Sequence, residues 1–325
     1  TNLKFISSCK CIKPALAGDS CRIEVNIIKE KSDHIIFEGI VLVEGLIILE
    51  INFGLSIAPI TNKAQIHPLA FVHSTAILGK DVYIGPNVFI GESVIIGDRC
   101  RIEANAIIEK WTQMGEDNHI HYGAVIGSTP QDIKYNNEKS ETVIGNRNDI
   151  REYVTINRAT GKNNQTTIGC DNLLLTQAHI GHNCIIENNT IIVNMANIGG
   201  HCLIQNNATI GGMTGIHQFS RIGTGAMVGA YTRLPKDVLP FFLCEGNPAT
   251  VKKLNIIGLR RNKTSKKAFS ELNQLSTLIF EENLNTTQCI KKINNQTFES
   301  EEAKILIKFI KEKSERGFIK KTPSE

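Results

Sequence analysis

Aliphatic side chains recur at every sixth position in two long stretches of the chain. The first series runs from Ile66 to Ile126 and the second from Ile168 to Val228, and neither contains an exception. This period fits neither an α-helix nor a long strand, in which one face recurs about every 3.6 or about every 2 residues. It fits short strands joined by tight turns around a triangular prism, with the aliphatic side chains stacked inside. The pattern therefore predicts a parallel β-helix from Ile66 to about Pro240, with three hexapeptides in each coil.

Small residues mark the turns of this repeat. Glycine often follows the aliphatic residue directly, as at Gly79, Gly85 and Gly97, and asparagine is frequent near the turns. Both residue types adopt positive φ at little steric cost, so we expect them to form the corners of the prism.

Two polar stretches interrupt the repeat, at residues 128–142 and 158–165. We expect both to be loops that project from the prism. In a rigid scaffold, loops that break the pattern carry function more often than the elements that they connect. A tolerated insertion is the alternative for each of them.

The pattern changes on both sides of the repeat. Residues 22–28, 35–43 and 46–52 alternate apolar and polar side chains, which is typical of antiparallel strands. After Glu245 the apolar residues take helical spacing, with a cap at Thr264 or Ser265. The fold class is therefore mainly β, in three parts: a small β segment at 1–62, the β-helix at 63–245 and a helical domain at 246–325.

Composition and charge narrow the class of protein. With 41% hydrophobic residues and a net charge of +4, the chain is typical of a globular protein and not of a disordered, collagen-like or coiled-coil one. It shows no export signal or membrane span, and its 9 cysteines form no CxxC pair, so we expect reduced thiols in the cytoplasm. From Thr250 onward, 16 Lys and Arg face 9 Asp and Glu. This excess suggests an acidic partner or an anionic substrate, and a solvated helical face is the alternative.

Histidines of the second series fall on one face of the predicted prism. Residues separated by three hexapeptides should lie one above another, which stacks His182, Gly200 and Gln218 in one column. His201 and His217 fall in the two adjoining columns, and His179 lies near the preceding corner. Imidazole accepts a proton near neutral pH, and the N–H of Gly200 would be open to a developing oxyanion. This pairing suits acyl transfer to a hydroxyl, although three imidazoles can also bind zinc; a scaffolding solenoid would need rows of threonine that the chain lacks.

Several motifs resemble one enzyme family, the UDP-N-acetylglucosamine O-acyltransferases. They lie between residues 64 and 320 and read IHPLAFVHSTAILG, GSTPQDIKY, NDIREYVTINRAT, DNLLLTQAHIGHNC, GGMTGIHQF, EGNPATVKKLNIIGLRRN and SERGFI. The hexapeptide part is shared with many transferases, whereas the other motifs together are specific to this family.

The resemblance implies a left-handed parallel β-helix and a cytoplasmic homotrimer. It implies transfer of a 3-hydroxyacyl chain from acyl carrier protein to the 3-hydroxyl of UDP-N-acetylglucosamine, the first step of lipid A biosynthesis, in a cleft between adjacent prisms. The only prosthetic group implied is the carrier's phosphopantetheine; no metal, nucleic acid or stable membrane insertion is implied. By match to the motifs, His182 is the general base and Gly200 the oxyanion donor, and the substrate-binding positions are Gln131, Asp132, Lys134, His179, His201, His217, Gln218, Asn255 and Arg261.

The chain departs from the family pattern at a few of these motifs. Asn183 follows the base where the family typically has Asp, and an N-acyltransferase relative also has the His-Asn pair. Ile257 and Asn262 replace residues that are usually Glu and Arg beside the nucleotide. Ala230 stands at the position that limits the acyl-chain groove, and its small side chain leaves the groove fairly long. A related N-acyltransferase that uses a 3-amino sugar nucleotide, and a trimeric zinc hydratase, are the alternative functions.

The N-terminal segment, 1–62, resembles a different enzyme. The stretches KPALAGDSCRIEV and FEGIVLVEG are similar to the closing strands of a hot-dog 3-hydroxyacyl-carrier-protein dehydratase. The central helix and the catalytic His and Glu of that fold have no counterpart in this segment. We therefore expect a partial hot-dog segment without dehydratase activity, or an unrelated β extension.

Overall fold

The structure is a computed structural model that describes the chain except for residues 1, 16–19, 31–33, 57–63, 281–285 and 322–325. The chain divides into two compact units, Thr1–Asn62 and Lys63–Glu325. Within the described residues, no helix is both long and apolar enough to cross a membrane.

The first unit is a four-stranded antiparallel sheet. Three of its strands follow the alternation seen in the sequence, whereas the edge strand β1 was not expected from it. The strands are β1 (Asn2–Cys11), β2 (Cys21–Glu30), β3 (His34–Val43) and β4 (Leu46–Ser56), in the order β1-β4-β3-β2. A left-handed turn at Glu44 and Gly45 joins β3 to β4. The described residues of this unit form no helix, and its likeness to part of a hot-dog fold stays a prediction.

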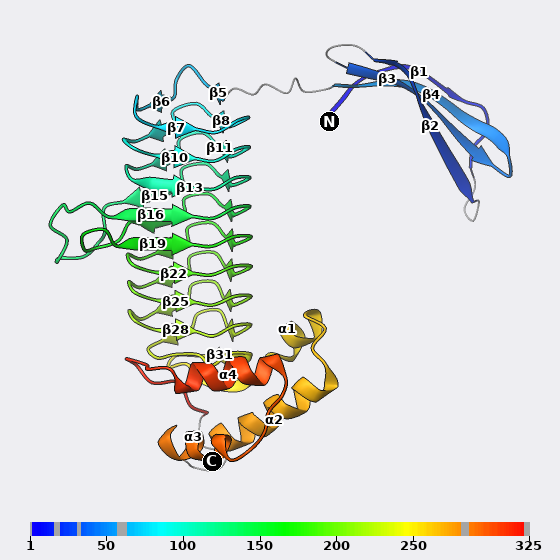
Figure 1. Ribbon diagram of the computed structural model, residues 1–325. Helices are drawn as coiled ribbons and strands as arrows, with labels where there is room; N and C mark the ends of the chain where they lie inside the picture. The colour runs from blue at the N-terminus through cyan, green and yellow to red at the C-terminus, as the bar shows by residue number, and fades with distance from the viewer. Residues whose placement is uncertain (1, 16–19, 31–33, 57–63, 281–285, 322–325) are drawn as a thin grey trace. The chain divides into compact units, whose positions relative to one another are not determined.

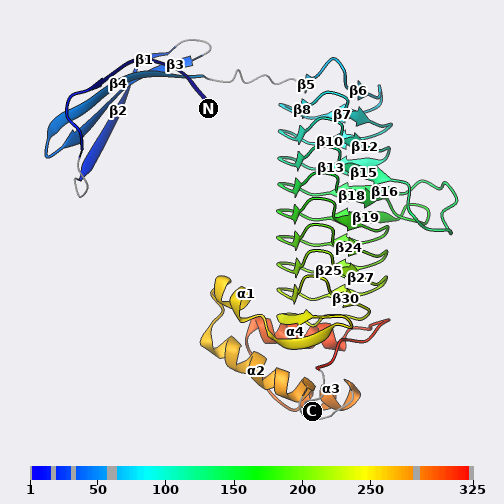
Figure 2. The same ribbon diagram turned by 180° about the vertical axis from the view of Figure 1, so that it is seen from behind.

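The second unit is a three-sided prism of short parallel strands, and Figures 1 and 2 show its coils stacked along one axis. One side contains β7 (Ile77–Leu78), β10 (Ile95–Ile96), β13 (Thr112–Met114), β16 (Glu141–Ile144), β19 (Gln165–Ile168), β22 (Ile185–Ile186), β25 (Leu203–Ile204) and β28 (Arg221–Ile222). The second side contains β5 (Gln65–Ile66), β8 (Tyr83–Ile84), β11 (Arg101–Ile102), β14 (His119–Ile120), β17 (Asp149–Ile150), β20 (Leu173–Leu174), β23 (Ile191–Ile192), β26 (Thr209–Ile210), β29 (Met227–Val228), β31 (Phe242–Glu245) and β32 (Thr250–Leu254). The third side contains β6 (Phe71–Val72), β9 (Phe89–Ile90), β12 (Ile107–Ile108), β15 (Val125–Ser128), β18 (Thr155–Asn157), β21 (His179–Ile180), β24 (Asn197–Ile198), β27 (Gly215–Ile216) and β30 (Arg233–Leu234).

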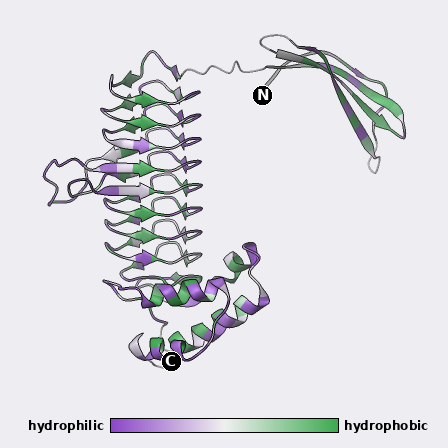
Figure 3. Ribbon diagram, viewed as in Figure 1, coloured by the Kyte–Doolittle hydropathy of each residue, from purple (hydrophilic) through white to green (hydrophobic). Residues whose placement is uncertain are grey.

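The register confirms the repeat of three hexapeptides per coil. Ile96 pairs with Leu78 in the preceding coil, and Ile198 pairs with Ile180 at the same spacing. The aliphatic residues of successive coils are fully buried along most of the prism, whereas Ile66 in the first coil is 47% exposed because no coil covers it. Figure 3 shows most strands of the prism hydrophobic and the projecting loops hydrophilic.

The two polar interruptions are loops, as predicted. Ile126 pairs with Ile156 and not with Ile144, as it would in a regular coil, so the first loop lengthens its coil by two hexapeptides. Ile156 pairs with Ile180 and not with Leu174, so the second loop lengthens its coil by one hexapeptide. Both loops project from the same side of the prism in Figures 1 and 2.

The expectation that glycine supplies positive φ at the corners was wrong at most positions. The left-handed residue stands three positions after the aliphatic one, and it is Asn or Asp at some corners but Trp111, Tyr153 or Met195 at others. The glycine that directly follows the aliphatic residue is needed for close packing instead. A Cβ on Gly181, for example, would lie 2.8 Å from the backbone N of Gly200 in the next coil.

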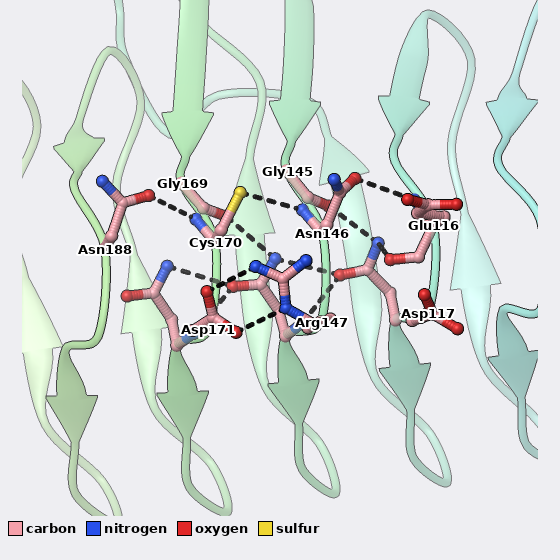
Figure 4. Close-up of polar contacts among 12 residues, drawn as sticks. Glu116, Asp117, Gly145, Asn146, Arg147, Gly169, Cys170, Asp171 and Asn188 are labelled. Carbon is pink, nitrogen blue, oxygen red and sulfur yellow. Dashed lines mark hydrogen bonds and ion pairs between the residues drawn. The ribbon is translucent and has the colours of Figure 1, made fainter.

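Side chains accept hydrogen bonds from the backbone N–H groups along one corner of the prism (Figure 4). The N–H groups of Glu116, Asn146 and Cys170 donate to a side chain of the next coil, at 2.9, 3.2 and 2.8 Å. Beside them, buried asparagines repeat the pattern, and Asn148 donates from its N and Nδ2 to Asn118 Oδ1, both at 2.9 Å. This corner therefore leaves few backbone donors for a ligand.

Helices cover the C-terminal end of the prism, as the sequence predicts (Figure 1). They are α1 (Ile256–Arg261), α2 (Lys266–Phe280), α3 (Thr286–Asn294) and α4 (Glu301–Lys311). Ser265 Oγ accepts the N–H of Ala268 at 3.1 Å and so caps the start of α2. The apolar faces of α2 and α4 are buried, which closes the core of the last coil. The antiparallel strand β32 precedes them, and the sequence pattern did not predict it.

Candidate active site

A groove of about 400 Å³ lies where β21, β24, β27 and β30 end. It contains six of the residues predicted from the sequence: Gln131, His179, His182, Gly200, His217 and Gln218. The predicted columns are confirmed, because β21, β24 and β27 pair in register at one coil per step. His201 stacks on Phe219 with ring centroids 4.7 Å apart and meets the His182 ring edge-on at 5.1 Å.

His182 is held in one orientation by the residue that follows it. The histidine is 5% exposed, and its Nδ1 lies 2.8 Å from Asn183 Oδ1. Two hydrogen bonds fix the Asn183 amide: the Thr160 N–H donates to Oδ1 at 2.9 Å, and Nδ2 donates to the Thr160 carbonyl at 3.0 Å. Since Oδ1 must then accept from His182, the proton is on Nδ1 and the lone pair is on Nε2. Nε2 is the nitrogen that a general base in the groove would use.

Gly200 brings the imidazole and a backbone donor together. A Cβ at this position would lie 2.5 Å from His182 Nε2, so only glycine lets the ring lie against this turn. In the part of the chain that the structure describes, the Gly200 N–H donates to no protein acceptor, unlike its counterparts on the asparagine-lined corner. Beside the base there is therefore a buried N–H that is free to bind an anionic oxygen.

The first loop places a carboxylate near the base. Asp132 Oδ2 lies 3.9 Å from His182 Nε2, and Asp132 Oδ1 accepts the N–H of Lys134 at 3.0 Å. That backbone hydrogen bond lowers the pKa of Asp132, so the carboxylate is ionised at neutral pH. A negative charge at this distance stabilises imidazolium as it forms. Asn183, which is neutral, cannot do so.

The second loop holds the first one in place. Glu138 Oε1 accepts the N–H of Gly161 at 2.6 Å, and the Lys139 carbonyl accepts the N–H of Asn163 at 2.8 Å. Since Thr160 also fixes Asn183, this added hexapeptide contacts both the first loop and the residue that orients His182. Its place beside the base could not be seen from its sequence.

Arg158 anchors both loops to the prism and was missed by the sequence analysis. Its side chain is only 4% exposed and donates to the Gly127 carbonyl at 2.9 Å, to Thr129 Oγ1 at 3.2 Å and to the Tyr135 hydroxyl at 3.1 Å. A buried guanidinium with several acceptors is strongly positioned. An arginine directly after a strand of the repeat was the signal that could have identified it.

Arg316 was also missed, although it belongs to the SERGFI motif. Its guanidinium donates to the Gln218 carbonyl at 3.0 Å and contacts the His217 ring. The C-terminal segment thus reaches back to the groove, 98 residues from Gln218 in sequence. Arg233, Asn157 and Asn197 line the groove as well and were not predicted.

Two histidines in or beside the groove, His179 and His201, have lowered pKa values. Burial lowers the pKa of His179, and the neighbouring His182 lowers it further. Its Nδ1 lies 2.8 Å from Thr155 Oγ1. Partial desolvation lowers the pKa of His201 in the same direction. Both rings are therefore neutral at pH 7 and suit hydrogen bonding to an uncharged ligand group.

Six predicted residues do not line this groove. Asp132 and His201 lie next to His182, Lys134 is exposed in the first loop, and Asn255, Arg261 and Ala230 lie elsewhere on the chain. Asn255 caps α1 by accepting the N–H of Gly258 at 3.0 Å, and Arg261 is exposed at the end of the same helix. Ala230 is exposed after β29, on a different side of the prism. In Figures 1 and 2, α1 and the two loops project to opposite sides of the prism.

The groove does not gather metal ligands within the described residues of one chain. The set of three ligand atoms close enough for one ion lies elsewhere, at His119, His121 and Asp149. This cluster was not predicted from the sequence.

Comparisons with known proteins point mainly to one family. A family model described as UDP-N-acetylglucosamine O-acyltransferase, domain 2, matches residues 237–319, and a model of a GMPPB C-terminal domain matches residues 66–166 in the hexapeptide repeat. The acyl-(acyl-carrier-protein)-UDP-N-acetylglucosamine O-acyltransferase of Gloeothece citriformis is 44% identical over 58% of this chain and 68% of its own. The enzyme of that name from Rippkaea orientalis is 49% identical over 60% of this chain and 72% of its own.

A solved structure supports the same assignment over a longer part of the chain. The UDP-N-acetylglucosamine acyltransferase of Bacteroides fragilis superposes with a TM-score of 0.76 and 38% identity, over 78% of this chain and 100% of that one. The resemblance drawn from the motifs and the left-handed β-helix are thereby confirmed. The chain belongs to the UDP-N-acetylglucosamine O-acyltransferase family.

Proposed function

We propose that the protein transfers a 3-hydroxyacyl group from acyl carrier protein to the 3-hydroxyl of UDP-N-acetylglucosamine, the first step of lipid A biosynthesis. The observation that carries the proposal is a fixed imidazole that lies against the turn at Gly200, whose N–H has no acceptor within the described residues. His182 presents Nε2 beside the free N–H of Gly200, in a groove of a chain that belongs to this family.

The proposed reaction uses the imidazole of His182 and the backbone N–H of Gly200 together. His182 Nε2 takes the proton of the sugar hydroxyl while its oxygen attacks the thioester carbonyl, and the Gly200 N–H stabilises the resulting oxyanion. When the tetrahedral intermediate collapses, the C–S bond breaks and the leaving sulfur receives the proton from the imidazolium. The ester and the free thiol of the carrier's phosphopantetheine are the products. The proposed steps use no metal ion and no other cofactor.

We place the sugar nucleotide and the thioester around this pair. Gln131, Asp132 and Lys134 are proposed to bind the sugar nucleotide from the first loop, because that loop reaches the base. The imidazoles and amide that line or flank the groove are proposed to contact the sugar and the thioester; they are His179, His201, His217 and Gln218.

We further propose a homotrimer in which each groove is completed by a neighbouring copy. Ala230 and Arg261 are exposed and lie outside the groove of their own chain, although the family resemblance assigns them to the acyl groove and the nucleotide. A second copy that packs its other face against the groove would supply them together with Asn255. We place the enzyme in the cytoplasm, since Cys9, Cys11 and Cys21 are exposed free thiols.

The test measures product mass after incubation with 3-hydroxyacyl carrier protein and UDP-N-acetylglucosamine. We expect the parent protein to form the O-acyl sugar nucleotide, and His182→Ala to lower the rate about 100- to 10,000-fold. Gly200→Ala should lower it about 100-fold or more, because its Cβ would displace the His182 ring. His67→Ala, in the first coil, is the matched control and should keep full activity. Equal activity in all four proteins would refute the proposal.

The His182-Asn183 pair supports a second candidate, transfer to an amine, because an N-acyltransferase relative has the same pair. A 3-amino sugar nucleotide offered in the same assay separates the two. Product from the amine alone would establish N-acyl transfer.

A further inference from the structure

A second cluster of chemically active side chains lies on another side of the prism. His119 and His121 flank the inward Ile120 of β14, so both imidazoles point outward. Asp149 in β17 pairs in register with His119, one coil further along. One ligand atom from each of these three residues lies within 4.8 Å of the other two.

Two atoms of this cluster are buried without a hydrogen bond. His121 Nε2 and Asp149 Oδ1 lie 2.6 Å apart, yet neither has a hydrogen-bond partner. The His121 residue is 9% exposed, so water does not readily replace the missing partner. The short distance places two atoms of metal-ligating type, a ring nitrogen and a carboxylate oxygen, next to each other.

Each imidazole also has a carboxylate at its other nitrogen. His119 Nε2 lies 3.1 Å from Glu103 Oε1, which leaves its Nδ1 available. His121 Nδ1 lies 3.5 Å from Glu152 Oε1, which leaves Nε2 toward Asp149. A carboxylate behind a histidine fixes the ring and raises its basicity, and this is the usual outer shell of a metal-bound histidine.

The charges around the cluster also suit a cation. Arg101 pairs with Glu103 at 2.5 Å and Arg151 pairs with Glu152 at 3.0 Å, so each outer carboxylate has its own arginine. No Lys or Arg forms an ion pair with Asp149 within the described residues, and Arg151 acts on it only through longer-range attraction. The close neighbours of the Asp149 carboxylate are therefore the two imidazoles.

We propose that His119, His121 and Asp149 form a binding site for a late first-row divalent cation, with zinc as the best fit. Imidazole nitrogen selects zinc, nickel or copper over magnesium and calcium. Two imidazoles and one carboxylate supply three ligands to a tetrahedral ion and leave its fourth position for water. Ligands of a tetrahedral zinc ion lie about 3.3 Å apart, so His121 and Asp149 would separate by roughly 0.7 Å. The ion would clamp β14 to β17, the two rungs between which the first loop is inserted. The site is independent of the acyl transfer proposed above.

The test is titration of the metal-free full-length protein with Zn²⁺ by calorimetry and with Co²⁺ by visible absorption. The parent for all variants has Cys9, Cys11 and Cys21 replaced by serine, which removes the exposed thiols that also bind zinc. We expect one ion per chain, a cobalt spectrum typical of four nitrogen and oxygen ligands, and a higher melting temperature with zinc but not with magnesium. His182→Ala should bind as the parent does, so that failure of the proposed enzyme activity does not bear on the site.

Variants of the cluster decide the outcome. Asp149→Asn and His119→Gln should each weaken zinc binding at least 100-fold, and Glu103→Gln, which leaves the ligands in place, should weaken it about 10- to 100-fold. His67→Ala is the histidine control and should not change the affinity. The proposal is overturned if the parent binds no zinc, or if folded Asp149→Asn and His119→Gln proteins bind it as tightly as the parent.

Discussion

Asn183→Asp is expected to raise the activity of the proposed base. The carboxylate would still accept from His182 Nδ1, now 2.8 Å from the amide oxygen, and from the Thr160 N–H. Only the hydrogen bond from Nδ2 to the Thr160 carbonyl would be lost. The backbone tolerates the change, because Asp171 occupies the same left-handed position at φ 60° as Asn183 at φ 59°.

The magnitude follows from the distance between the charges. A carboxylate about 4 Å from the centre of an imidazolium contributes about 4 kcal/mol at an effective dielectric constant of about 20. The half-buried side chain and the lost hydrogen bond, which costs about 1 kcal/mol, reduce the net gain to about 1–2 kcal/mol. The rate constant should therefore rise about 5- to 30-fold.

The assay is the pH dependence of kcat/KM for transfer to UDP-N-acetylglucosamine. We expect the plateau of kcat/KM above the acid limb to rise about 5- to 30-fold. Asn189→Asp is the matched control, because Asn189 is an exposed left-handed residue at φ 56° outside the groove. An unchanged plateau in folded Asn183→Asp would refute charge stabilisation of His182.

Three further predictions test the scaffold. Arg158→Ala should lower the free energy of unfolding by about 2–4 kcal/mol, because buried acceptors lose their donor; urea denaturation measures this change. It should also raise KM for the sugar nucleotide, because the first loop loses its anchor, and steady-state kinetics measure that effect. Ile198→Ala should cost about 2–5 kcal/mol in the same denaturation assay, whereas Ile66→Ala, at the open end of the prism, should cost less than about 1 kcal/mol, and equal costs would contradict the stacking of the core. Burial lowers the pKa of His179 in the folded chain, so below the ordinary pKa of 6.5 the unfolded chain binds a proton that the folded chain does not. The free energy of unfolding should therefore fall as the pH drops below 6.5. His179→Gln should reduce this loss, which urea denaturation midpoints at several pH values measure.

The sequence alone was sufficient to predict the β-helical prism and the stacking of the residues that line the groove. Each hexapeptide must bury one aliphatic side chain against the rung one coil away, so the spacing of these residues fixes the fold. Because a regular coil has a constant length, counting three hexapeptides correctly placed His182 below Gly200 and Gly200 below Gln218. The conclusion is local, since no loop interrupts the second series.

Counting three hexapeptides per coil fails where a loop interrupts the repeat. It pairs His119 with Asn137 in the first loop, whereas the structure pairs His119 with Asp149 beyond that loop. Only the fold shows how far a loop lengthens its coil, so the cluster of His119, His121 and Asp149 could not be predicted.

The sequence by itself determined the family, the β-helix and six of the residues that line the groove, because a periodic chain repeats its geometry at every rung. The tertiary structure decided which atoms act. It fixed the tautomer of His182 through the contact between Thr160 and Asn183, and it brought Arg316 to the groove from the far end of the chain. Such contacts depend on where irregular segments fold back, and no local pattern of side chains encodes that position.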